Sequence, residues 1–362
     1  MNKTNSTNWR SIAALPRRAE VNSWALNLGN HLVENVDESR IKKEAQKWNP
    51  YRSVLVAAPN YHHFLPLVRI SRFRKTAIAK NYLLIYIAGI AWGILAIFAA
   101  MVAYISVRPA TGFLSAAFAL AAIALIFDAR KIRNSPHTLF ERSLFIAWLK
   151  TSKESRAGLL LWITLLSFTG ITQLWLNFTL GGWEPAAIRY GAIIKLIGAG
   201  EWWRIMTGPY FHSSIAHFVG NVTMAIYIGP IAFALVGWRS LAIFFLANAV
   251  GVISFAIFGS GAFEVYMGIS PGVLALFSML FAIGVRRARF LPRGMANFFI
   301  TIAVVSAFGS EALSSSSASA AHVAGILLGL IAGAAGWRSM RALKCDQKNR
   351  TQISKHAMQK FN

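Results

Sequence analysis

Long apolar stretches separated by short polar segments fill the chain after residue 80. A stretch of roughly 17 to 25 apolar residues can cross the hydrocarbon core of a bilayer as a helix, at about 1.5 Å per residue. The pattern therefore predicts an all-α polytopic membrane protein with a polar N-terminal region. The eight expected helices cover residues 82–107, 112–127, 158–179, 213–235, 239–258, 267–285, 294–309 and 318–336.

The apolar pattern also divides the chain into parts. The first two stretches are joined by a short polar turn and predict a helical hairpin. In the following segment, residues 128–157, the apolar residues share one helical face, which is typical of a helix lying on the membrane surface. That face holds Phe140, Leu144, Phe145 and Trp148, whereas Glu141, Arg142 and Lys150 lie off it. The expected parts are a soluble basic region at 1–80, two extra transmembrane helices and the interfacial helix at 81–157, a six-helix core at 158–336 and a basic tail at 337–362.

Basic residues outnumber acidic ones, 37 to 13, and their placement sets the orientation of the helices. Segments on one side of the eight stretches, the two terminal regions included, hold all the basic residues except Arg108, Arg189, Lys195 and Arg204. Because Lys and Arg concentrate on the cytoplasmic side, both termini are expected in the cytoplasm, with the basic N-terminal region beside anionic lipid. This placement accounts for the net charge of +24 without a nucleic-acid partner. A bacterial inner (cell) membrane is the expected location.

A serine between two glycines opens the stretch 267–285, in Gly268-Ile269-Ser270-Pro271-Gly272. The two glycines clear the space around Ser270, so that another backbone or a substrate can approach. The same pattern marks the nucleophile elbow of soluble hydrolases, but here it opens a membrane helix and follows no predicted strand. A serine that only bonds the carbonyls of its own helix is the alternative.

A histidine lies at a similar depth, a little over one turn into the last stretch. His322 shares a helical face with Gly325 and Gly329, which predicts a close approach to another helix. Ionisable groups inside a membrane are costly and usually functional, and imidazole is the usual general base for a serine. A glycine face that only packs helices remains the alternative reading.

Further polar groups occur before and within the stretch 213–235. His217 and Asn221 are four residues apart, so they lie on one helix face, where they can either stabilise an oxyanion or bridge helices by hydrogen bonds. A metal site from His212, His217 and His322 is not favoured, because residues 212 and 217 point about 140° apart on a helix and no carboxylate lies beside them. We therefore expect neither a metal nor another cofactor.

Together these motifs resemble those of the rhomboid intramembrane serine proteases. They are Glu201-x-Trp203-Arg204, His212-x4-His217-x3-Asn221, Gly268-x-Ser270 and Ala321-His322-x2-Gly325-x3-Gly329, within residues 158–336. The resemblance implies that the six-helix core is a rhomboid core. It implies Ser270 as the nucleophile, His322 as its general base, and His217 and Asn221 as the lining of the oxyanion hole. The supporting residues would be Trp203, Arg204, His212, Gly268, Gly272, Gly325 and Gly329, with Trp203 and Arg204 in a loop that lies partly in the outer leaflet.

The implied function is cleavage of single-pass membrane proteins near the outer end of their transmembrane helix, so the expected partners are transmembrane substrates and the lipid bilayer. The oligomeric state is not predicted. After residue 158 the acidic residues fall in expected loops or in the tail, which indicates a Ser–His dyad without the acid of a soluble triad. The same absence argues against an aspartyl protease, and no His-Glu-x-x-His motif indicates a zinc protease.

Two positions depart from the rhomboid pattern. Many rhomboids have glycine directly after the nucleophile, where this chain has Pro271, and an aromatic residue four positions after it, where this chain has Leu274. These changes are the only support for the alternative of a proteolytically inactive rhomboid-like protein that binds membrane clients, and the presence of both Ser270 and His322 speaks against it. A small-molecule transporter would show inverted repeats and midplane polar groups, which the sequence lacks. The short stretch 294–309, with Phe298 and Phe299, is the expected lateral gate for a substrate.

Overall fold

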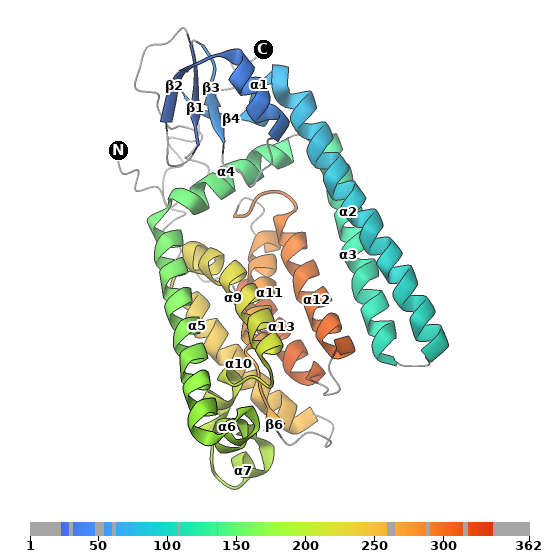
Figure 1. Cartoon of the computed structure of the whole chain (residues 1–362), viewed down its shortest axis with the longest axis vertical. Coiled ribbons are helices and arrows are strands. Elements are labelled where there is room, and N and C mark those ends of the chain that lie inside the picture. The colour runs from blue at the N-terminus through green and yellow to red at the C-terminus, as the bar shows by residue number, and fades with distance from the viewer. Residues whose placement is uncertain are drawn as a thin grey trace.

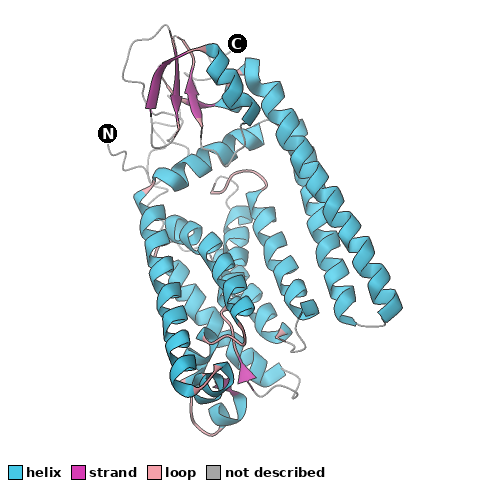
Figure 2. Cartoon of the chain, viewed as in Figure 1, coloured by secondary structure: helices cyan, strands magenta, loops and turns pink. Residues whose placement is uncertain are grey.

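The computed structural model describes residues 23–28, 32–47, 54–59, 63–106, 109–135, 137–258, 265–286, 290–313 and 318–335, so the tail expected at 337–362 lies outside the described residues. Helices dominate, and the strands are confined to an N-terminal sheet and one short pair (Figure 2). The sheet lies at one end of a helical bundle, and a long helical hairpin runs along one side of that bundle (Figure 1).

Each of the eight expected helices is present within the described residues. Of these, α2, α5, α9 and α10 are long and apolar enough to cross a membrane, while α11, the Met295–Ala307 part of α12, and α13 are apolar but shorter. The prediction of an all-α polytopic membrane protein is confirmed. The eight helices are α2 (Ser71–Ser106), α3 (Pro109–Asn134), α5 (Lys153–Leu180), α9 (Ile215–Val236), α10 (Arg239–Phe258), α11 (Ser270–Arg286), α12 (Met295–Leu313) and α13 (Ser319–Ala334).

The N-terminal region forms a small α/β module that the sequence pattern did not predict. Its four antiparallel strands have the order β2-β1-β3-β4. The module also contributes a helix, and α2 begins inside the region expected to end at residue 80. The elements are β1 (Trp24–Asn27), β2 (Leu32–Val36), α1 (Glu38–Lys47), β3 (Leu55–Ala57), β4 (Leu65–Pro66) and the 3-10 helix η2 (Leu67–Arg69).

Both faces of this sheet are covered, because neighbouring strand residues point to opposite faces. Leu26 and Val56 belong to a buried cluster that includes Ile41 of α1. Their neighbours Ala25 and Leu55 belong instead to the main core, which runs through α4 and the bundle. The module is therefore continuous with the membrane helices.

The segment expected to lie on the membrane surface forms the helix α4 (His137–Thr151), and its apolar face packs against protein. It passes between the sheet and the bundle (Figure 1). Leu144, Phe145 and Trp148 share a buried face as expected, but that face packs against protein. Glu141, expected off that face, is only 5% exposed. This helix joins the module to the bundle.

Polar contacts fix α4 to its neighbours, and we call Asp128, Glu141, Arg142 and Arg293 the α4 polar cluster. The guanidinium of Arg142 pairs with both carboxylate oxygens of Asp128 at the end of α3, at 2.7 Å for Oδ2. It also donates to the carbonyl oxygen of Arg293 at 3.3 Å, and the N–H of Arg293 donates to Glu141 Oε2 at 2.9 Å. The cluster therefore connects α3, α4 and the segment that leads into α12.

The hairpin α2–α3 packs on the outside of α12, with α3 next to it. Within α12, Phe299 is fully buried and its ring lies 6.1 Å from that of Phe277 on α11, whereas Phe298 is 37% exposed. A lateral gate at α12 stays a prediction. A substrate that enters there has to pass beside the hairpin or displace it.

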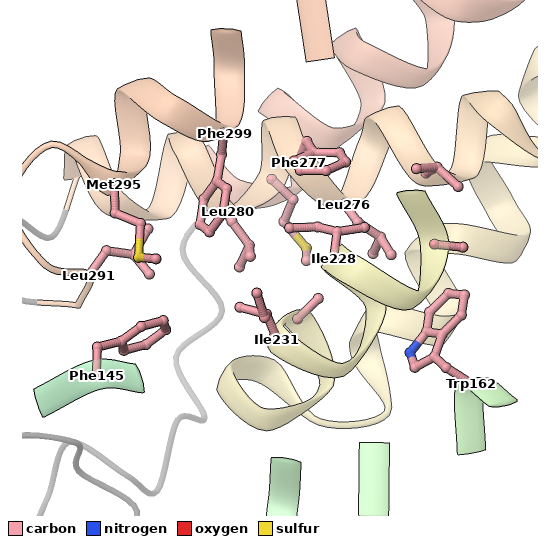
Figure 3. Packing of buried hydrophobic residues seen from close by; sticks show 14 of the residues in the cluster. Phe145, Trp162, Ile228, Ile231, Leu276, Phe277, Leu280, Leu291, Met295 and Phe299 are labelled. Carbon is pink, nitrogen blue, oxygen red and sulfur yellow. The ribbon is translucent and has the colours of Figure 1, made fainter. Parts of the chain in front are cut away.

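Close packing of α11 against α13 organises the centre of the bundle. Side chains from α4, α5, α9, α11 and α12 fill the core around it (Figure 3). A Cβ at Gly325 or at Gly329 would lie closer than 3.0 Å to backbone atoms of Pro271 or Ala275 on α11. The close approach expected from the glycine face is present, and only glycine permits it.

Between α5 and α9 the chain folds into short elements at the end of the bundle away from the N-terminal sheet (Figure 1). The short strand β5 of this segment pairs antiparallel with β6, which lies outside the segment and precedes α11. The segment is thereby tied to the start of α11. The elements are α6 (Trp183–Tyr190), β5 (Ala192–Ile193), α7 (Ile194–Gly198), α8 (Arg204–Thr207), the 3-10 helix η3 (Gly208–Tyr210) and β6 (Val265–Tyr266).

Breaking the α4 polar cluster should lower stability more than breaking a surface pair. Arg142→Ala leaves the carboxylate of Asp128 without its partner in a site where the two side chains are 14% and 23% exposed. We expect a loss of about 2 kcal/mol in the free energy of unfolding, below the cost for a fully buried pair because some solvent screening remains. The control is Arg72→Ala, whose pair with Glu38 is 62% and 31% exposed and is expected to contribute less than about 1 kcal/mol. Thermal unfolding in one detergent compares the two, and equal melting temperatures would contradict the assigned role.

Adding one methyl group to the glycine face should also destabilise the protein. In Gly329→Ala the new Cβ meets the carbonyl oxygen of Ala275 and the Ser278 hydroxyl, so α13 must move away from α11. Overpacking of this kind costs about 1 to 3 kcal/mol. Gly112→Ala is the matched control, since a Cβ there meets nothing within 4 Å. A melting temperature that falls in the control as much as at residue 329 would contradict this packing.

Candidate active site

Ser270 is the first residue of α11 and follows a tight turn after β6. Gly268 in this turn has φ +111°, a backbone conformation that favours glycine. Its N–H donates to the carbonyl oxygen of Pro209 at 3.1 Å, and its carbonyl oxygen accepts from the buried Tyr266 hydroxyl at 3.1 Å. These bonds hold the backbone that presents Ser270.

His322 lies in the first turn of α13 and is 5% exposed. Its Nε2 is 2.8 Å from Ser270 Oγ, although the two residues are 52 positions apart in the chain. The glycine packing of α13 on α11 sets this distance, because Gly325 lies one turn after His322 and directly against Pro271. A hydroxyl and an imidazole in this geometry can exchange a proton.

His217 and Asn221 lie one turn apart on α9 and face the turn before Ser270. A Cβ at Gly268 would be 2.8 Å from His217 Nε2 and 3.4 Å from Asn221 Nδ2. Within the described part of the chain, Asn221 Nδ2 is buried and has no hydrogen-bond acceptor. Ser214 caps the helix by accepting the N–H of His217 at 3.1 Å. A buried donor without an acceptor beside a serine is suited to bind a developing oxyanion.

His212 lies just before α9, and its ring packs against that of His217. It is 1% exposed, its ring lies 5.1 Å from the rings of His217 and Phe218, and neither ring nitrogen has a hydrogen-bond partner among the described residues. Burial, with a further contribution from His217, lowers the pKa of His212 to about 3, so the ring is neutral. Its role is to pack against His217.

Gln173 on α5 is a residue that sequence reasoning missed. Its side-chain amide donates to the carbonyl oxygen of His212 at 2.8 Å and accepts the N–H of His212 at 3.1 Å. Gln173 is 3% exposed, and both bonds fix the backbone before α9. The sequence feature that could have identified Gln173 is its amide within the apolar stretch 158–179, where a polar group needs a hydrogen-bond partner.

Arg204 holds together the segment between α5 and α9. It is 5% exposed, and its Nη1 donates to the carbonyl oxygens of Ile188 at 3.2 Å and Gly191 at 2.8 Å. Its Nε donates to Glu201 Oε2 at 2.7 Å, and its guanidinium lies 4.6 Å from the ring of Trp203, which is 44% exposed. Trp203 and Arg204 thus shape the loop that carries β5 and do not belong to the group around Ser270.

The structure gathers Ser270, His322, His217, Asn221 and Gly268 in one place, and it brings Gly272 against α10. A Cβ at Gly272 would meet Phe244 and Asn248 of that helix closer than 3.0 Å. Asn248 was not singled out from the sequence. A serine hydroxyl, an imidazole beside it and a buried amide donor are groups that can carry out acyl transfer.

Residues 199–339 match the family model described as Rhomboid domain. The matched range includes Ser270, His322, His217 and Asn221. No curated protein shows a match to the chain. The match to the family model shows a rhomboid domain over residues 199–339 of the chain.

Proposed function

We propose that this protein is an intramembrane serine endopeptidase with Ser270 as nucleophile and His322 as general base. The observation that carries the proposal is the 2.8 Å distance between Ser270 Oγ and His322 Nε2. This distance lies within the roughly 2.6 to 3.2 Å over which an imidazole can take the proton of a hydroxyl. The match to the rhomboid family, which acts on transmembrane substrates, supports the same reaction.

In acylation, Ser270 Oγ attacks the carbonyl carbon of the scissile peptide bond while its proton moves to His322 Nε2. The carbonyl oxygen becomes an oxyanion, and its donors are the amide of Asn221, the ring of His217 and the N–H of Ser270. The C–N bond then breaks, and His322 gives the proton to the leaving amine. The amino-terminal part of the substrate, which carries the attacked carbonyl carbon, remains as an ester on Ser270, and the carboxyl-terminal part leaves with the new amine.

In deacylation, a water molecule gives one proton to His322 while its oxygen attacks the ester carbon. The bond to Ser270 Oγ breaks, and the proton of His322 returns to that oxygen. One peptide bond and one water molecule become a carboxylic acid and an amine. The sequence of steps needs no metal and no other cofactor.

We propose single-pass transmembrane proteins as substrates, cut near the outer end of their membrane helix. The support is topological: β6, which leads to Ser270, lies at the end of the molecule away from the N-terminal sheet (Figure 1). The basic first turns of α2 and the basic last turn of α3 lie at the sheet end. With that end in the cytoplasm, as the charge rule favours, both termini are cytoplasmic and the dyad opens outward. A bacterial inner membrane fits this orientation.

The division of the chain that we propose assigns catalysis to residues 158–336, with 1–80, 81–157 and 337–362 as accessory parts. Ser270, His322, His217 and Asn221 all come from α9, α11 and α13. The hairpin α2–α3 and the N-terminal module contact the bundle from outside through α12 and α4. These contacts favour a supporting role for the accessory parts.

The first test is labelling of the purified protein with a fluorophosphonate probe, which reacts with activated serines. We expect labelling of the wild type and a loss of at least about a thousandfold in labelling rate for Ser270→Ala and His322→Ala. Asn221→Ala, which removes one oxyanion donor, should slow labelling about 100-fold or more.

Ser278→Ala is the matched control, because Ser278 is a buried serine of the same helix whose hydroxyl donates to the carbonyl oxygen of Leu274 at 2.9 Å. Its labelling rate should equal that of the wild type. A folded wild type that does not react would overturn the proposal. It would favour the client-binding alternative, for which Pro271 after the serine is the specific observation.

A further inference from the structure

The residues in the first turn of α11 differ in whether their backbone N–H groups are available as hydrogen-bond donors. The N–H groups at the start of a helix have no partner within the helix. In α11, Pro271 contributes no N–H, and the N–H of Val273 reaches back to the carbonyl oxygen of Ile269 at 3.2 Å. The N–H groups of Ser270 and Gly272 remain to be accounted for.

The N–H of Gly272 donates to Asn248 Oδ1 on α10 at 2.8 Å. Asn248 is 1% exposed and lies within an apolar helix that is long enough to cross a membrane. An amide in such surroundings is costly unless it is bonded. The bond from Gly272 satisfies the amide oxygen, whereas Nδ2 has no acceptor among the described residues. Because Gly272 has no Cβ, the amide can lie directly on the backbone of α11.

Pro271 fits the same face of α10. A Cβ at Gly251 would lie 2.7 Å from a ring carbon of Pro271, so only glycine leaves room for the ring. Gly251 is three residues after Asn248 and therefore on the same side of α10. The backbone of Pro271 also contacts Gly325 of α13. The first turn of α11 is thus held between two helices.

We propose that Asn248 is a positioning residue for Ser270, an inference that rests on the proposed protease activity. Asn248, Gly251 and Pro271 form what we call the interhelical cap, which fixes the first turn of α11 from α10. The cap occupies the N–H of Gly272, and Pro271 offers none. The N–H of Ser270, which makes no hydrogen bond among the described residues, is then the one backbone donor of this turn left for an oxyanion.

This arrangement has a chemical consequence. Proline after the nucleophile removes a backbone donor, so catalysis depends more on the exact direction of the Ser270 N–H and Oγ. A misplacement of about 1 Å can cost about 100-fold in rate. Asn248 acts on the reaction only by holding Gly272, two residues after the nucleophile, and touches neither substrate nor reacting atoms.

The test compares Asn248→Leu, which keeps the size of the side chain but removes the acceptor, with Asn248→Asp, which keeps an oxygen for the N–H of Gly272. Proteins are reconstituted in lipid vesicles with a single-pass substrate, and active sites are counted with the fluorophosphonate probe. For Asn248→Leu we expect kcat to fall about 10- to 100-fold with KM unchanged, since a positioning defect acts on the transition state. Asn248→Asp should recover most of that loss.

Ser240→Ala is the control on the same helix. Ser240 is fully buried and donates to the carbonyl oxygen of Gly237 at 2.7 Å, at the other end of α10. Its kcat should match the wild type. Melting temperatures of all variants separate a loss of folded protein from a loss of rate.

The outcomes are distinct. If Asn248→Leu lowers only the melting temperature and keeps the wild-type kcat per active site, Asn248 is structural and the positioning role is wrong. If Asn248→Asp is as slow as Asn248→Leu although both are folded, the bond to Gly272 is not the cause. A folded wild type that neither labels nor cleaves overturns the protease proposal, and the positioning role with it.

Discussion

The close backbone contact between α11 and α13 is the constraint on which the rest of the site depends. Gly325, Gly329 and Gly333 lie where any Cβ would run closer than 3.0 Å to α11. This contact brings an imidazole on one helix to 2.8 Å from a hydroxyl on the other. Buried helix packing therefore sets the distance between the two side chains.

Different polar contacts stabilise the two ends of the molecule. At the end with β5 and β6, buried polar side chains hold irregular backbone: Arg204 binds the loop carbonyls, and Gln173 fixes His212. Backbone outside helices is tolerated in or near a bilayer only where such partners satisfy it. At the opposite end, the α4 polar cluster joins the accessory parts to the start of α12. Polar contacts are therefore present at both ends of the bundle.

The sequence predicts the membrane helices well, because the length of an apolar stretch is a local property. The helix expected at 239–258 has those bounds in the structure, and the other core helices begin and end within a few residues of the expected positions. The pairing of Ser270 with His322 was also predictable, from their depth, from the glycine face and from the family resemblance. The family match identifies the domain but does not test the roles of the individual residues, which stay predictions.

Features that depend on distant partners were not predictable. The strands of the N-terminal sheet have two to five residues, and their pairings, such as Trp24 with Val36, are set by tertiary contacts. Glu141 seemed to belong to a polar face, but its partner Arg293 is 152 positions away. Gln173 and Asn248 each lie within an apolar stretch, and only the folded structure shows that they bind the backbone of His212 and of Gly272.

Cleavage of a membrane-embedded substrate tests the central claim most directly. The purified protein and a single-pass substrate would be reconstituted in vesicles, and the products mapped by mass spectrometry. We expect the wild type to make one cut near the outer end of the substrate helix and the Ser270→Ala protein to leave the substrate intact. Cleavage by the Ser270→Ala protein at the same position, or an intact substrate with a folded and probe-reactive wild type, would contradict it.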